Sequence, residues 1–181
     1  MVLQDQAVRA GADGRLYGRE RIQGLHRVID GGRTDRAERF IATSPEEVWA
    51  AQTDPDRLVR WLPPDDATME VLAFDPTPGG AYRLRLTFTE TGVGKTQAST
   101  DEVHGRFVAL DEPTRIVQEV DFVSTDDAYA GTMRMTWDHI AAAGGTKVSV
   151  TAKNVPPGID RAVHEAALAS SLAKLAAEVE G

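Results

Sequence analysis

The spacing of apolar residues near the end of the chain predicts a long amphipathic helix. Four of them recur at intervals of four, three and four, namely Leu168, Leu172, Leu175 and Val179. These intervals place the side chains on one face of an α-helix, and His164 lies one turn earlier on the same line. Seven alanines between residues 160 and 181 favour a helix and keep it slim. A curved sheet can therefore pack closely against it or leave space beside it.

Much of the chain before this helix alternates apolar and polar residues, which is the pattern of strands with one buried face. The alternation is clearest where four residues of one face are Tyr82, Leu84, Leu86 and Phe88. Clusters of turn-forming residues separate these segments at close spacing, which indicates hairpins and an antiparallel sheet. We expect strands near residues 36–43, 69–74, 81–89, 100–109, 115–123, 131–139 and 146–153.

Two short helices are expected between the first and second strands. Ser44 can cap the backbone amide of Glu47, whose carboxylate can reach back to Ser44, and Pro45 suits the first helical position. Asp54, which is also followed by a proline, repeats this arrangement and predicts a second helix. The second helix should end at the two prolines of residues 63–64, because proline interrupts helical hydrogen bonding.

This order of elements predicts an α+β fold. A sheet with one buried face must be covered, and the long C-terminal helix is the element large enough to cover it. We therefore expect a curved antiparallel sheet of about six to seven strands wrapped around that helix. One domain should span residues 35–181. Residues 1–34 contain six glycines and no sustained period, so we expect them to form a flexible N-terminal extension.

Composition narrows the classes of function. The formal net charge of −8 argues against nucleic-acid binding, which requires a concentrated basic surface. The chain has no cysteine, which excludes disulfides and suits a reducing compartment. No segment approaches the roughly 18 apolar residues of a membrane span, and the N-terminus lacks the pattern of a secretory signal. We expect a cytoplasmic protein with no membrane span.

Four segments resemble a known family. They read SPEEVWAAQTDPDRLVRWLPP, PGGAYRLRL, HGRFVALDEPTRIVQEVDF and GTKVSVTAKNVP, and the amphipathic helix follows them. Together they resemble the START-like helix-grip superfamily, in particular the group named after the C-terminal domain of the activator of the heat-shock-protein-90 ATPase. The resemblance covers residues 35–181. The two-domain co-chaperone has a further N-terminal domain, for which we expect this chain to be too short.

The resemblance implies a helix-grip fold with a cavity between sheet and helix, which in many relatives holds an apolar molecule. Its members include lipid carriers, cyclases, toxin-resistance proteins and co-chaperone modules, so the fold alone does not define an activity. The aromatic, thioether and aliphatic residues expected around the cavity are Trp61, Tyr82, Leu84, Leu86, Phe88, Phe107, Met135, Trp137, His164 and Leu168. The alternative is that most of them are ordinary core residues. His164 either bonds the ligand or lies at the cavity rim, where a carbonyl or a water molecule satisfies it.

The histidines do not indicate a metal site. They are His26, His104, His139 and His164, and none of them pairs at a metal-ligand spacing. We expect no metal and no cofactor. His104 and His139 should lie on the exposed polar face of the sheet.

Two acidic residues bear on the possibility of catalysis. Glu119 and Asp121 alternate with Val120 and Phe122. If the apolar pair faces inward, the acids face solvent, whereas a shift of one residue would reverse the two faces.

Three functional hypotheses follow. The first is a binding module that holds a small apolar or lipid-like molecule without covalent chemistry. The second is a protein-interaction module that stimulates a chaperone ATPase. The third is a cyclase-like or hydrolase-like enzyme that uses His164, Tyr82 or Glu119 as an acid or base. The sequence shows no assembled catalytic cluster, so we expect no catalytic residue.

Overall fold

The computed structural model describes residues 32–90, 94 and 96–181. Residues 1–31 of the expected flexible extension therefore lie outside the described residues. Thr34, the last residue of the extension expected over residues 1–34, is the first residue of strand β1.

The described residues form a seven-stranded antiparallel sheet with the strand order β1-β7-β6-β5-β4-β3-β2. The strands are β1 (Thr34–Ile41), β2 (Ala67–Phe74), β3 (Ala81–Phe88), β4 (Thr100–Asp111), β5 (Arg115–Phe122), β6 (Met133–Ala142) and β7 (Gly145–Lys153). The helices are α1 (Pro45–Thr53), α2 (Pro55–Trp61), the short 3₁₀ helix η1 (Asp127–Tyr129) and α3 (Arg161–Glu180). These elements confirm the predicted α+β class.

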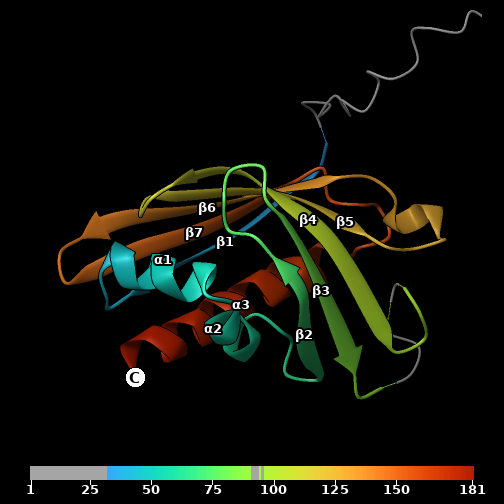
Figure 1. Ribbon diagram of the computed structural model, residues 1–181, viewed down its shortest axis with the longest axis horizontal. Coiled ribbons are helices and arrows are strands. Elements are labelled where there is room, and N and C mark those ends of the chain that lie inside the picture. The colour runs from blue at the N-terminus through green and yellow to red at the C-terminus, as the bar shows by residue number, and fades with distance from the viewer. Residues whose placement is uncertain (1–31, 91–93, 95) are drawn as a thin grey trace, which may run out of the picture.

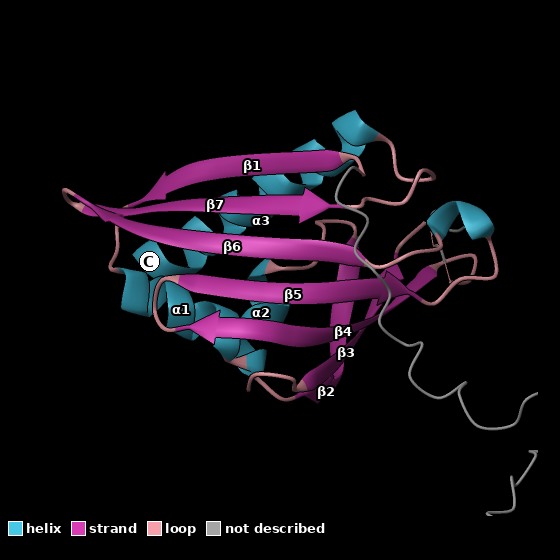
Figure 2. Ribbon diagram, turned by 90° about the horizontal axis from the view of Figure 1, so that it is seen from above, coloured by secondary structure: helices cyan, strands magenta, loops and turns pink. Residues whose placement is uncertain are grey.

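The sheet curves around α3, and α1 and α2 lie at the side of that helix (Figure 1). Seen from above, β2 and β3 run in a different direction from β1, β7 and β6 (Figure 2). Register shifts occur in β2 between Val71 and Ala73, and in β4 between Phe107 and Ala109. Irregularities of this kind bend a strand and increase its twist, which allows one sheet to cover several sides of a helix.

The apolar face of α3 is the one that the sequence predicts. Leu168, Leu172 and Leu175 are buried, and Val179 packs against the core while partly exposed. His164 is on the same side, and its side chain is 12% exposed. The 3.6-residue period therefore identified the buried face correctly.

The predicted helix starts are present, with one difference. The Ser44 hydroxyl accepts a hydrogen bond from the Glu47 amide at 3.3 Å, and Asp54 caps α2 through the Asp56 amide at 2.9 Å. The Glu47 carboxylate does not return to Ser44, however. It accepts a hydrogen bond from Arg57 at 2.7 Å, because α2 packs beside α1 and brings a guanidinium within reach.

A carboxylate near the end of α3 joins this helix to α2. Glu178 accepts hydrogen bonds from Arg57 at 3.1 Å and from Arg60 at 2.6 and 3.0 Å. The bond from Arg60, supported by the one from Arg57, outweighs the desolvation and lowers the pKa of Glu178 from 4.5 to about 2. The ionised carboxylate therefore fixes α2 against the C-terminal half of α3.

This ion pair predicts a specific dependence of stability on pH. Because the pKa of Glu178 is lower in the folded protein, its stabilising effect is complete above pH 4.5 and is lost as the pH falls towards about 2. Glu178→Gln should reduce the loss of stability between pH 5 and pH 2, as measured by denaturant unfolding at each pH. Glu70→Gln, which removes a carboxylate that is 64% exposed, is the control and should leave the slope unchanged. An unchanged slope in Glu178→Gln would contradict this role.

Candidate ligand-binding cavity between the sheet and α3

A cavity of about 240 Å³ lies between the inner face of the sheet and the helices. Strands β2 to β6 provide most of its wall, and α1, α2 and the N-terminal half of α3 provide the remainder. Eight of the ten residues expected around such a cavity line it, namely Trp61, Tyr82, Leu84, Leu86, Met135, Trp137, His164 and Leu168. The structure therefore brings together residues that are up to about a hundred positions apart in the sequence.

Phe88 and Phe107 do not line the cavity, which corrects two of the expected positions. Phe107 is fully buried, and its ring centroid lies 5.2 Å from that of Tyr82 and 5.5 Å from that of Phe74. These two rings line the cavity and Phe107 packs behind them. Phe88 is the last residue of β3 and is partly exposed, so it lies beyond the enclosed part of the sheet.

Two tryptophans anchor α2 to the cavity wall. Trp61 of α2 and Trp137 of β6 meet edge to face, with their ring centroids 5.9 Å apart. The Trp61 indole nitrogen donates a hydrogen bond to the Ala51 carbonyl at 2.9 Å. An edge-to-face pair whose polar atom has a partner provides a rigid apolar wall.

Small residues of α3 leave space next to the sheet. Ala167 and Ser171 both line the cavity, and Ala167 is also exposed, which places it at the mouth. Between the buried leucines of this helix, short side chains cannot reach the strands opposite. The alanine-rich composition noted in the sequence therefore has a direct structural effect.

Strand β5 carries a polar residue on the wall that the sequence reading did not identify. Ile116, Gln118, Val120 and Phe122 alternate along the strand and all line the cavity. Gln118 lies two residues before Val120, so the two-residue period already places it on the inner face. It was overlooked because only the apolar positions of this strand were used.

The acidic residues of β5 lie on the opposite face. Glu119 accepts hydrogen bonds from Arg106 at 2.6 and 2.9 Å and lies 3.6 Å from Arg134. Asp121 accepts one from the Thr132 hydroxyl at 2.7 Å. The predicted register is therefore correct, and Glu119 is not in a position to act as an acid or base in the cavity.

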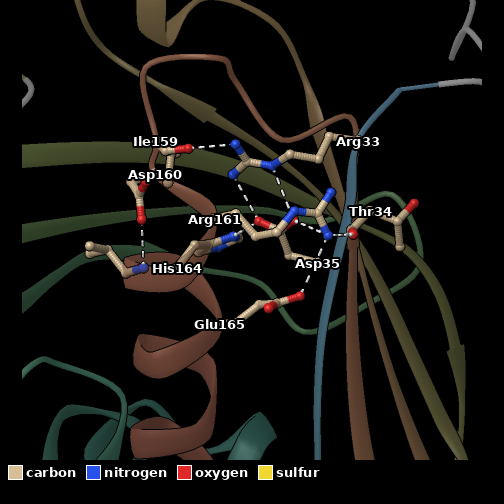
Figure 3. A network of polar contacts seen from close by, with 9 residues as sticks. Arg33, Thr34, Asp35, Ile159, Asp160, Arg161, His164 and Glu165 are labelled. Carbon is tan, nitrogen blue, oxygen red and sulfur yellow. Dashed lines mark hydrogen bonds and ion pairs between the residues drawn. The ribbon is translucent and has the colours of Figure 1, made fainter.

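A buried carboxylate fixes His164 (Figure 3). The side chain of Asp35 is fully buried and accepts hydrogen bonds from Arg33 at 2.8 and 3.0 Å and from His164 Nδ1 at 2.8 Å. Arg161 lies 3.6 Å from the same carboxylate. Burial raises the pKa of Asp35, but the bonds from His164 and Arg33 outweigh it and hold the pKa below its ordinary value.

The ionised Asp35 determines which nitrogen of His164 carries a proton. A carboxylate only accepts, so Nδ1 must donate to it. The other ring nitrogen, Nε2, has no hydrogen-bond partner within the described part of the chain, and the residue lines the cavity. The partner of His164 is therefore neither the carbonyl nor the water that the rim interpretation expects, but a carboxylate 129 residues away in sequence.

His139 is buried, contrary to the expectation that it lies on the exposed face. It follows Met133, Met135 and Trp137 at intervals of two, so it shares their inner face. Its Nδ1 lies 2.7 Å from the Pro113 carbonyl and its Nε2 lies 2.9 Å from Gln52 Oε1. Burial lowers the pKa of His139, which favours the neutral ring. His104 is 45% exposed and contacts Glu102 at 2.9 Å, as expected for the outer face.

Tyr82 is a hydrogen-bond donor in this cavity rather than a base. Burial raises the pKa of Tyr82, so its phenol remains protonated near neutral pH and can donate a hydrogen bond.

Among the described residues, no group of three or more histidine, aspartate or glutamate side chains could hold a metal ion. No helix in the described part of the chain is long and apolar enough to cross a membrane.

The fold and the cavity together define a START-like helix-grip domain. A family model described as Activator of Hsp90 ATPase homolog 1-like protein matches residues 42–180, and the chain belongs to this family. This confirms the resemblance found in the sequence. No match was found among curated proteins.

Solved structures share this fold. A protein from Chromobacterium violaceum is 28% identical, with a TM-score of 0.73 over 82% of this chain and 97% of its own. A protein from Rhodobacter sphaeroides is 22% identical, with a TM-score of 0.68 over 83% of this chain and 95% of its own. An AHSA1-like protein from Aeromonas hydrophila is 21% identical, with a TM-score of 0.63 over 82% of this chain and 92% of its own.

The position of the Tyr82 ring can be tested through Gly105. The two residues are directly paired between β3 and β4, and a Cβ atom at Gly105 would overlap the ring. Gly105→Ala should therefore lower the free energy of unfolding by about 1–3 kcal/mol, as overpacking does. The same substitution in a Tyr82→Ala background should cost much less, because the ring is gone. Equal costs in both backgrounds, measured by denaturant unfolding, would contradict this placement.

Proposed function

We propose that this protein binds a small, neutral, largely apolar molecule in the cavity between the sheet and α3, without covalent chemistry. We also propose that it acts in the cytoplasm, which a cysteine-free sequence suits. The observation that carries the proposal is a largely apolar cavity of about 240 Å³ with a mouth at Ala167. The ligand-binding residues in this proposal are those predicted residues that line the cavity.

The size of the cavity limits the ligand. An apolar cavity of about 150 Å³ can hold benzene, whereas pockets for drug-sized ligands begin near roughly 300 Å³. A cavity of about 240 Å³ therefore suits a molecule between these sizes, such as a fused bicyclic ring or a medium-length chain.

The chemistry of the wall supports a neutral ligand. None of the described residues that line the cavity is an aspartate, glutamate, lysine or arginine. A charged ligand group buried there would lose hydration without gaining a permanent opposite charge. Burial of apolar surface would supply most of the affinity, and polar atoms such as His164 Nε2 would orient the ligand.

Two alanines of α3 provide a matched test of the binding site. Ala167 lines the cavity at its mouth, whereas its neighbour Ala166 is exposed and is not part of the lining. Native mass spectrometry of the protein purified from its own host should show a co-purifying small molecule. Ala167→Trp should abolish it by filling the mouth, and Ala166→Trp should retain it.

The proposal would be contradicted by the absence of any co-purifying mass, together with an unfolding temperature that no compound in a panel of lipid-like and polyketide-like molecules changes. Loss of the bound mass in both tryptophan variants would contradict the assignment of the mouth.

A second candidate function is stimulation of a chaperone ATPase. The family description names an activator of the Hsp90 ATPase. On the outer face of the sheet, Phe40 is 51% exposed and Ile140 is 59% exposed, and both are paired with Lys147 in the strand between them. An exposed apolar pair beside a lysine offers a contact surface for a protein partner.

An ATPase assay distinguishes this candidate from ligand binding. If the outer face acts on Hsp90, the protein should raise its ATPase rate, and the double variant Phe40→Ser and Ile140→Ser should reduce that effect. Ala167→Trp, which alters the cavity mouth, should leave it unchanged. No change in the ATPase rate at saturating protein would eliminate the candidate.

A further inference from the structure

A buried amide on the cavity wall has an atom without a partner. Gln52, near the end of α1, is 5% exposed and lines the cavity. Its Oε1 lies 2.9 Å from His139 Nε2, while its Nε2 is buried and has no hydrogen-bond partner among the described residues. An unpaired buried polar atom destabilises a protein, so its presence in a residue of the cavity wall points to a partner supplied by the ligand.

The contacts of His139 define which atom of this amide is free. The Pro113 carbonyl can only accept, so the Nδ1 atom of His139, 2.7 Å away, carries a proton. If the ring is neutral, its Nε2 is an acceptor and the Gln52 amide must present its NH₂ group to it. If the ring is charged, its Nε2 donates and Gln52 presents its oxygen. The two amide orientations occupy nearly the same volume.

In both orientations, His139 uses one end of the amide, and the other end lies at the position where the structure gives the Gln52 nitrogen no hydrogen-bond partner among the described residues. Because burial lowers the pKa of His139, the neutral ring is favoured, and the free end of Gln52 is then its carbonyl oxygen. A hydroxyl group suits this position best, because it can donate to a carbonyl oxygen and can also accept from an NH₂ group.

We propose that the ligand of this cavity is an apolar molecule carrying a hydroxyl group, and that this hydroxyl pairs with the amide atom of Gln52 that His139 leaves free. This inference rests on the proposed ligand-binding function and specifies the chemical class of the ligand. A pure hydrocarbon would leave the amide atom of Gln52 unpaired. A ligand carboxylate would be buried without an opposite charge, because none of the described residues that line the cavity is a lysine or arginine.

Two probes of the same shape test the hydroxyl. 1-Naphthol and 1-methylnaphthalene differ by a hydroxyl in place of a methyl group, and both are intermediate in size between benzene and a drug-sized molecule. Calorimetric titration gives the ratio of their affinities for the wild-type protein. Gln52→Met, which replaces the amide by a side chain of similar length, should shift this ratio against naphthol by roughly five- to tenfold, the effect of one hydrogen bond.

The second glutamine of the wall provides the matched control. Gln118→Met makes the same chemical change on β5 and should leave the ratio as in the wild type. A ratio unaffected by Gln52→Met would overturn the inference, including the case in which only Gln118→Met changes it. If the wild-type protein binds neither probe, and no compound of the wider panel, the ligand-binding proposal itself fails.

A measurement on the wild-type protein covers the case in which Gln52→Met does not fold. The side-chain amide signals of Gln52 in a ¹⁵N–¹H NMR spectrum should shift on addition of naphthol by clearly more than on addition of methylnaphthalene. Equal shifts with both probes would overturn the inference.

Discussion

Charged contacts fix the long helix to strand β1 at one end and to helix α2 at the other, and the cavity depends on this constraint. At the N-terminal end, the buried Asp35 of β1 binds His164 of α3. At the C-terminal end, Glu178 binds Arg57 and Arg60 of α2. Moving α3 closer to the sheet would break the hydrogen bond between His164 and the buried carboxylate of Asp35. Removing one partner of a buried ion pair is strongly destabilising. The helix is therefore held in place where its side chains are too short to fill the space beneath it.

The cavity has an energetic consequence for the protein. Atoms that line an empty space lose the dispersion contacts that they would make in a packed core, and the loss grows with cavity volume. A ligand restores these contacts and stabilises the folded state in proportion to its concentration and affinity. The polar atoms of the wall add selectivity, because a molecule that leaves them unpaired gains less than one that satisfies them. The cavity is therefore a place where the packing of the domain is incomplete.

The fold could be predicted to a large extent from local patterns. The period of Leu168, Leu172 and Leu175 identified the buried face of α3, and the alternation of Tyr82 and Leu84 identified the inner face of β3. The proline-containing caps at Ser44 and Asp54 gave the starts of the two short helices. Each of these signals depends on residues within a few positions of one another, which is the range over which a single sequence is informative.

The polar part of the site was less accessible to this reasoning. His139 was expected on the outer face because it is polar, and Gln118 was not considered because only the apolar positions of β5 were used. The two-residue period places both inside. The contact of Gln52 with His139 joins residues 87 positions apart, and that of Asp35 with His164 joins residues 129 positions apart. Such pairs follow from how the elements pack in space, which no local pattern specifies.

The central claim is that the space beneath the N-terminal half of α3 is open and apolar. The most direct test is a crystal structure determined under xenon pressure, because xenon enters apolar cavities without needing a specific chemical partner. The account predicts xenon density enclosed by Val120, Met135 and Leu168, which face the cavity from β5, β6 and α3. A structure in which these side chains fill the space and no xenon binds would contradict it.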